Sequence, residues 1–192
     1  MNDAQKFENF GCIKISNFID PESISIISNY FENKINRGEW KEGYEGRNAS
    51  TKYFYYADPL IEVLLLKSKD AVEKIVGKKL LPTYSYSRIY QPGEELTPHV
   101  DRNSCEITVT VNVANKGENS PIFMKYGSKE SGEYILNPGD AVIYKGCEVK
   151  HWRNVLKDDQ LTVQFMLHYV DENGPNFKFA KDRRPKYGLN TV

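Results

Sequence analysis

Alternation with a period of two residues is frequent in the chain after Lys79. In the stretch 106–113, threonines and an asparagine alternate with isoleucine and valines, and the stretch 160–169 repeats this scheme. A third stretch, 84–90, places three tyrosines and Arg88 at every second position. Because successive side chains of a β-strand point to opposite sides of the sheet, each stretch predicts a strand, and the first two predict one polar and one apolar face. The second half of the chain is therefore expected to form β-sheets.

Two helical segments are expected before these strands. The first covers 21–36, with Asp20 as its N-cap residue, and the second covers 59–76, where Gly77 ends it. Helices followed by many short strands predict a mainly β fold with N-terminal helices, namely a double-stranded β-helix (a jelly roll, or cupin-like barrel). The apolar strand faces would pack under the helices. The polar faces would line the barrel interior or, alternatively, meet solvent on one side of the sheet.

Length and composition narrow the class of protein. The 192 residues fit one domain, 1–192, with helical support at about 18–77, a β-helix core at about 80–170 and a C-terminal extension at 171–192. Lys plus Arg and Asp plus Glu both number 26, and this neutral balance argues against a nucleic-acid partner. No apolar run reaches the roughly 20 residues of a membrane span, and no signal-peptide pattern is evident. Three widely spaced cysteines argue against a disulfide framework, so we expect a cytoplasmic location.

Two of the three histidines belong to a pattern that predicts a metal site. His99 and Asp101 are two residues apart, so on an extended strand both side chains point the same way. His151 follows after a further predicted turn and strand. Two histidines and one carboxylate form the facial triad of non-haem iron oxygenases, which leaves metal positions open for O2 and a co-substrate. His168, late in the last strand, is expected to be structural or exposed and to lie beyond the depth of the metal.

The order of these motifs resembles a known family. After the helices come Tyr90-Gln91-Pro92-Gly93, His99-Val100-Asp101, Pro138-Gly139-Asp140 and His151-Trp152-Arg153. This order resembles the Fe(II)- and 2-oxoglutarate-dependent oxygenases, particularly the prolyl-4-hydroxylase-like and phytanoyl-CoA-dioxygenase-like groups, and the stretch 84–170 carries the similarity. The resemblance implies a double-stranded β-helix with iron ligands at His99, Asp101 and His151. It also implies O2-dependent decarboxylation of 2-oxoglutarate to succinate and CO2, usually coupled to hydroxylation of a C–H bond.

The resemblance also implies contacts for 2-oxoglutarate, and here the sequence departs from the family. Family members carry an Arg or Lys about nine or ten residues after the second iron histidine, and this cation pairs with the distal carboxylate. Gln160 stands in that region, with Gln164 on the same strand face. The missing cation can instead come from Arg88 or Arg153. Tyr90 matches a family tyrosine that hydrogen-bonds the co-substrate.

Two other classes of function fit a barrel with a metal. A cupin-type metal enzyme would need no 2-oxoglutarate, but cupins usually present His-x-His followed by Glu, and Asp101 stands where the second histidine would be. A non-catalytic binding domain could keep a structural metal, but such sites normally have four ligands and only three are convincing here. The retained carboxylate also favours hydroxylation over halogenation.

The substrate is expected to be a peptide or a small molecule. The stretch 37–58 lacks periodicity and is rich in glycine, charge and aromatic residues, so it is a candidate lid over the barrel mouth. Its characteristic side chains are Trp40, Tyr44, Arg47 and the run Tyr53–Tyr56.

Overall fold

The computed structural model describes residues 1–42, 52–129 and 132–187. In chain order the described elements are α1 (Asp3–Phe10), β1 (Cys12–Ile15), α2 (Pro21–Asn36), β2 (Lys41–Glu42), β3 (Tyr53–Tyr56), α3 (Pro59–Val76), β4 (Leu80–Tyr90), β5 (Leu96–His99), η1 (Asn103–Cys105), β6 (Ile107–Lys116), β7 (Ile122–Tyr126), β8 (Gly132–Tyr134), β9 (Ala141–Lys145), β10 (Val149–Arg153), β11 (Leu161–Asp171) and η2 (Phe177–Arg183).

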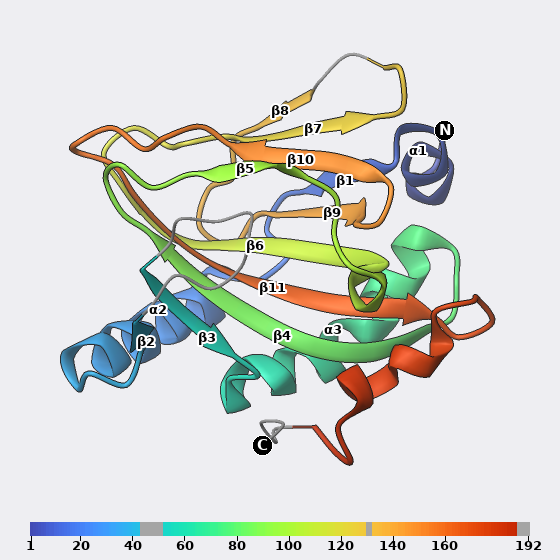
Figure 1. Ribbon diagram of the computed structural model, residues 1–192, viewed down its shortest axis with the longest axis horizontal. Helices are drawn as coiled ribbons and strands as arrows, with labels where there is room; N and C mark the ends of the chain where they lie inside the picture. Colours follow the sequence, from blue (N-terminus) through green and yellow to red (C-terminus); the bar gives the residue numbers. More distant parts are fainter. Residues whose placement is uncertain (43–51, 130–131, 188–192) are drawn as a thin grey trace.

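Two antiparallel sheets face each other and enclose the barrel interior (Figure 1). The larger sheet has the strand order β1-β9-β6-β11-β4-β3-β2, and the smaller has the order β5-β10-β7-β8. Neighbours such as β11 and β4 are far apart in sequence, as a jelly roll requires. The predicted fold class, a mainly β double-stranded β-helix with N-terminal helices, is confirmed.

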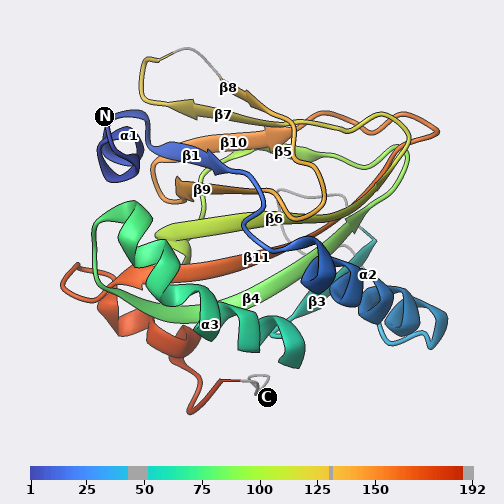
Figure 2. The ribbon, with the colours of Figure 1, turned by 180° about the vertical axis from the view of Figure 1, so that it is seen from behind.

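The helices lie outside the larger sheet. Figure 2 shows α2 and α3 against the outer side of this sheet. Both helices have the predicted bounds, with Asp20 as the N-cap of α2 and Gly77 at the end of α3. Helix α1 was not predicted, although Asn2 and Gln5 form a capping box at its start. This helix has 8 residues and buries only Phe7, so its apolar periodicity is too weak to be recognised.

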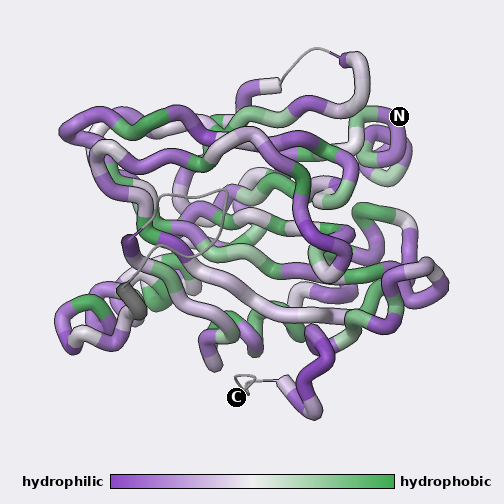
Figure 3. The backbone as a smooth tube through the Cα atoms, in the orientation of Figure 1, coloured by the Kyte–Doolittle hydropathy of each residue, from purple (hydrophilic) through white to green (hydrophobic). Residues whose placement is uncertain are grey.

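The two faces of the central strands separate as predicted. The apolar residues of β6 and β11, among them Val109, Val111 and Phe165, join residues of α2 and α3 in the main core. The polar residues of the same strands, such as Thr108 and Gln164, are also buried, so they line the interior and do not meet solvent. The solvent-facing alternative is therefore wrong. Figure 3 shows that hydrophobic and hydrophilic residues are mixed along the strands, while hydrophilic residues are frequent in the outer loops.

Part of the stretch 37–58, the candidate lid, lies in the main core and in the larger sheet. Trp40 is buried in the main core, where its ring lies 5.3 Å from that of Phe31. The run Tyr53–Tyr56 is strand β3, which pairs with β4. These residues are therefore not a loop over the mouth, while Tyr44 and Arg47 lie outside the described residues.

Residues 172–187, the described part of the predicted C-terminal extension after β11, pack against the barrel. Arg184 is buried and donates hydrogen bonds to Glu62 of α3 and to the carbonyl oxygen of Thr83 in β4. Asp182 accepts hydrogen bonds from Tyr56 and Arg102. Within the described part of the chain, none of the helices has the length and apolarity to cross a membrane.

Candidate metal centre

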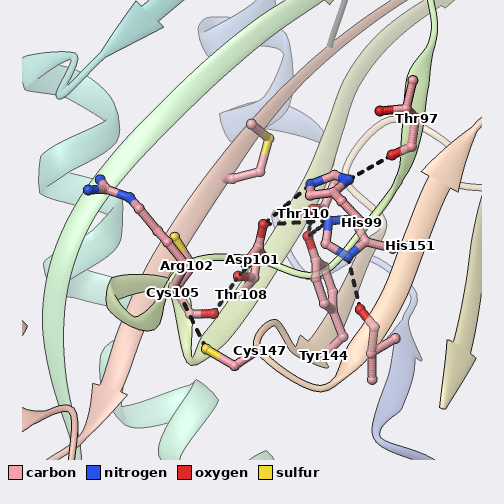
Figure 4. A network of polar contacts seen from close by, with 12 residues as sticks. Thr97, His99, Asp101, Arg102, Cys105, Thr108, Thr110, Tyr144, Cys147 and His151 are labelled. Carbon is pink, nitrogen blue, oxygen red and sulfur yellow. Dashed lines mark hydrogen bonds and ion pairs between the residues drawn. The ribbon is translucent and has the colours of Figure 1, made fainter. Parts of the chain in front are cut away.

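The smaller sheet brings the two predicted histidine ligands together. His99 ends β5 and is directly opposite His151 of β10 in the antiparallel pairing, so their ring centroids are 4.3 Å apart. Asp101 follows β5 by two residues. Its Oδ1 lies 3.6 Å from Nε2 of His99 and 3.6 Å from Nε2 of His151. The three predicted ligands thus converge on one point, as Figure 4 shows.

Backbone carbonyl groups set the orientation of both imidazoles. Nδ1 of His99 lies 2.8 Å from the carbonyl oxygen of Thr97, and Nδ1 of His151 lies 3.1 Å from that of Val149. A carbonyl only accepts, so each Nδ1 donates a proton to it, which leaves each Nε2 directed at Asp101 and available to a metal ion. This second contact of the ring is the usual way in which proteins fix a metal-binding histidine. Burial lowers the pKa of His151, although Asp101 opposes this, so its neutral form is favoured.

Asp101 is held from the other side by groups of the larger sheet and the adjoining turn. Its backbone N–H donates to the carbonyl oxygen of Gly146, and Thr108 of β6 donates to its Oδ2 over 3.0 Å. Burial raises the pKa of this carboxyl, but His99 and His151 outweigh burial, and the pKa is lower than usual. Asp101 is therefore an anion whose Oδ1 faces the two imidazoles.

The geometry fits one divalent metal ion. The ligand atoms of His99, Asp101 and His151 all lie within 4.8 Å of one another. Ligands about 2.1 Å from one metal ion and at right angles would lie about 3 Å apart, so a small inward movement completes the site. Two imidazoles and one carboxylate on one side leave the other metal positions open, which is the arrangement of non-haem iron sites.

Two arginines, the buried Arg153 and the half-buried Arg88, lie further inside the barrel. Arg153 follows His151 by two residues on β10, its Cζ lies 5.3 Å from the ring centroid of Tyr90, and it donates to Gln164 over 3.0 Å. Arg88 of β4 is opposite Gln164 in the sheet, and its Nε and Nη1 are buried without a hydrogen-bond partner. Among the described residues, neither guanidinium has a carboxylate within ion-pair distance.

Comparison with known proteins gives a result at the level of structure. No protein-family model and no curated protein matches the sequence. A prolyl-4-hydroxylase from Pseudomonas putida superposes with a TM-score of 0.71 at 11% identity, covering 88% of this chain and 96% of that one. The epimerase SnoN, in complex with Fe3+, alpha ketoglutarate and nogalamycin RO, gives 0.71 at 12% identity over 98% of this chain and 91% of its own. A prolyl hydroxylase from Trichoplax adhaerens with a peptide fragment gives 0.70 at 13%, covering 88% and 87%.

The chain has the fold of the Fe(II)- and 2-oxoglutarate-dependent oxygenases. The similarity covers most of the chain, and His99, Asp101 and His151 are the candidate triad within this oxygenase fold. The matching proteins include hydroxylases, an epimerase and a carbocyclase. The fold by itself therefore fixes neither the reaction type nor the substrate.

The structure places Gln160 just before the strand to which the sequence pattern assigned it. Strand β11 begins at Leu161, and Gln160 lies in the turn before it, where it donates to the carbonyl oxygen of Glu118 and accepts from the N–H of Lys157. The first inward residue of β11 is Thr162, which is opposite Tyr90 and whose buried hydroxyl has no partner. The amide of Gln160 is therefore engaged in the turn, whereas the hydroxyl of Thr162 is a further candidate for contact with a co-substrate. The sequence offered this signal, since Thr162 shares the polar face of Gln164.

The prediction that His168 lies beyond the metal depth is wrong. Its side chain is buried in the interior, where Nδ1 lies 3.1 Å from Oγ1 of Thr108. The sequence analysis also missed Tyr144, whose hydroxyl lies 3.5 Å from Nε2 of His151. Both residues face inward on their strands. The strand pattern predicted that His168 faces the barrel interior. Its position along the barrel relative to the metal ligands depends on the length of β5, which the sequence did not indicate.

Proposed function

We propose that this chain is an Fe(II)- and 2-oxoglutarate-dependent oxygenase that hydroxylates a C–H bond of a peptidyl or small-molecule substrate, with release of succinate and CO2. The observation that carries the proposal is the convergence of Nε2 of His99, Nε2 of His151 and Oδ1 of Asp101 inside this fold. Bound Fe(II) would supply the activation of O2. The protein would hold this ion with two imidazoles and one carboxylate.

The unpaired arginines support a dicarboxylate co-substrate. Burying a cation without an anion is costly. Among the described residues, neither the buried guanidinium of Arg153 nor the buried Nε and Nη1 of Arg88 has an acidic partner, which supports an anionic ligand. Tyr90 lies close to both arginines. Its ring centroid is 5.3 Å from Cζ of Arg153. Burial lowers the pKa of Arg88, but Tyr90 and Tyr86 outweigh burial, and the pKa is raised. We assign the distal carboxylate of 2-oxoglutarate to Arg88, with Arg153, Tyr90 and Gln164 around it.

The carboxylate of Asp101 supports hydroxylation over halogenation. Halogenation needs a free metal position for the halide, and in this chain the carboxylate of Asp101 faces the metal position. Transfer of oxygen to the substrate is therefore the expected outcome.

An aromatic wall in the interior supports a substrate with an apolar portion. Phe54 stacks on Tyr86 with ring centroids 6.1 Å apart, and Tyr56 stacks on Tyr84 at 5.1 Å. Such rings favour flat or aliphatic groups over strongly hydrated ones. A peptide side chain and an aromatic metabolite both satisfy this condition.

The experiment is an anaerobic titration followed by a turnover assay. Fe(II) and 2-oxoglutarate are added to the full chain, and the weak visible charge-transfer band of the chelate is recorded; O2 is then admitted and succinate is measured. Asp101→Ala and His151→Ala should lose both signals, whereas Asp158→Ala, which removes an exposed carboxylate before β11, should keep them. Succinate formation that survives both ligand substitutions would falsify the assignment. Iron binding without any chelate band would favour the cupin-type alternative.

A further inference from the structure

A second group of metal-binding side chains adjoins the candidate iron site. One ligand atom each from Asp101, Cys105 and His168 lies within 4.8 Å of the others. The three come from different parts of the fold: the segment after β5, the short helix η1 and the last strand β11. Asp101 belongs to both groups.

The donors of this group are already close together, and two of the three are buried. Cys105 is 2% exposed and His168 is 5% exposed. The hydroxyl of Tyr84 lies 3.0 Å from Sγ of Cys105, and its ring centroid lies 4.4 Å from that of His168. An oxygen donor is therefore available beside the sulfur, and little reorganisation is needed to surround an ion.

The two oxygens of Asp101 face different neighbours. Oδ1 is the atom 3.6 Å from Nε2 of both His99 and His151. Oδ2 accepts from Oγ1 of Thr108, and this same hydroxyl lies 3.1 Å from Nδ1 of His168. The carboxylate is thus placed to serve one ion through Oδ1 and another through Oδ2, with the second ion replacing the contacts of Thr108.

We propose that Asp101, Cys105 and His168 bind a second, thiophilic divalent cation such as Zn(II), with Asp101 bridging to the iron site. The thiolate, imidazole and carboxylate set matches zinc, whereas the sulfur-free set of His99, Asp101 and His151 suits iron. Binding releases the thiol proton of Cys105 to solvent and forms one metal–sulfur bond without any redox change. The site goes beyond the proposed function and shares with it only Asp101.

Cobalt(II) provides a probe that distinguishes the two sites. A cysteine thiolate on Co(II) gives an intense near-ultraviolet charge-transfer band, and the first site has no sulfur ligand. Titration of the full chain should therefore show binding of two equivalents, only one of which produces this band. Zn(II) should remove the band at a lower concentration than Mn(II), because sulfur ligands discriminate against the harder ion.

Matched variants assign the band to residues. Cys105→Ser and His168→Gln should lose it and retain one equivalent of Co(II). Cys147→Ser is the control: its thiol is partly exposed and contacts the backbone oxygen of Arg102, so the band should persist. His151→Ala should lose the first equivalent and keep the band. Thermal unfolding of each variant confirms that it is folded.

The outcomes separate this inference from the proposed function. A wild type without the thiolate band overturns the second site, whatever its succinate production. A band that disappears in Cys147→Ser but survives Cys105→Ser also overturns it. A band that persists in His151→Ala supports the second site even if the wild type never turns over 2-oxoglutarate.

Discussion

The hydroxyl of Thr108 donates a hydrogen bond of 3.0 Å to Oδ2 of Asp101. Thr108 is on β6 of the larger sheet, whereas the histidines that face the carboxylate, His99 and His151, are on strands of the smaller sheet. The candidate metal centre is therefore assembled between the two sheets. Oδ1 points at the imidazoles because Oδ2 is held by Thr108.

Thr108→Val should weaken metal binding at the triad while the protein stays folded. The substitution keeps the shape of the side chain but removes the donor that orients Asp101. Loss of such a supporting hydrogen bond typically lowers metal affinity about 10- to 100-fold. The measurement is a titration with Mn(II), a hard ion suited to the sulfur-free site, followed by electron paramagnetic resonance.

Thr162→Val is the matched control for this prediction. Thr162 is a buried, inward-facing threonine of β11, but its hydroxyl has no partner and does not contact Asp101. Its loss should leave Mn(II) affinity unchanged. If Thr108→Val also binds Mn(II) like the wild type, Thr108 does not position the carboxylate.

Arg88→Met and Arg153→Met should weaken 2-oxoglutarate binding to different extents. Arg88 has two buried N–H groups without partners, whereas Arg153 has one and already donates to Gln164. We expect a loss of about 1.5–3 kcal/mol for Arg88→Met, the usual contribution of a hydrogen bond to a charged group, and a smaller loss for Arg153→Met. The measurement is anaerobic calorimetry with the Mn(II)-loaded protein.

The thermal stability of the same two variants provides the control. Removing a buried cation that lacks an anionic partner relieves a desolvation cost, so neither variant should melt earlier than the wild type without ligand. If the melting temperature does not fall, weaker binding of 2-oxoglutarate is due to the missing cation and not to a loss of folded protein. Unchanged binding in both variants would place the distal carboxylate elsewhere.

Much of the fold was predictable because its signals are local. The N-cap residues Asp20 and Asp58 and the prolines after them fix the starts of α2 and α3. The period-two alternation fixes which faces of β6 and β11 enter the core. The triad was visible for the same reason, since His99 and Asp101 are close in sequence.

Features that depend on where a strand begins, or on how far along the barrel a residue lies from the metal ligands, were not predictable. Gln160 fits the alternation of β11, but the strand begins one residue later and the turn takes its amide. Whether His168 reaches Asp101 depends on how far β5 extends alongside the interior, and no periodicity encodes this. Tyr144 likewise reaches His151 only because the ends of β9 and β10 are placed side by side by a turn.

Gly146→Ala should damage both stability and metal binding. A Cβ at this position would lie 2.0 Å from the carbonyl oxygen of Cys105 and 2.8 Å from Oδ2 of Asp101. The first of these atoms belongs to the backbone and cannot move cheaply, so the strain reaches the metal ligand. Overpacking of this kind typically costs about 1–3 kcal/mol. Urea unfolding and Mn(II) titration measure the two effects.

Gly127→Ala separates the steric effect from backbone strain. Gly127 has φ +60°, but a Cβ there would meet nothing within 4 Å. The substitution should cost about 1 kcal/mol through the left-handed conformation alone and leave Mn(II) affinity intact. Equal metal affinity in the two alanine variants would show that the close approach at Gly146 does not position Asp101.

His168 should make the metal-free protein less stable in mild acid. Burial lowers the pKa of its imidazole from 6.5 to about 4, so between these values the unfolded chain binds a proton that the folded chain does not. The stability contribution is complete above pH 6.5 and is lost as the pH falls towards 4, with a slope of at most about 1.4 kcal/mol per pH unit. His168→Gln removes this proton uptake. Urea unfolding from pH 7 to 4.5, about the range over which one proton is taken up, should therefore show a shallower loss of stability in the variant. Parallel curves for the two proteins would show that His168 is protonated as readily in the barrel as in the unfolded chain.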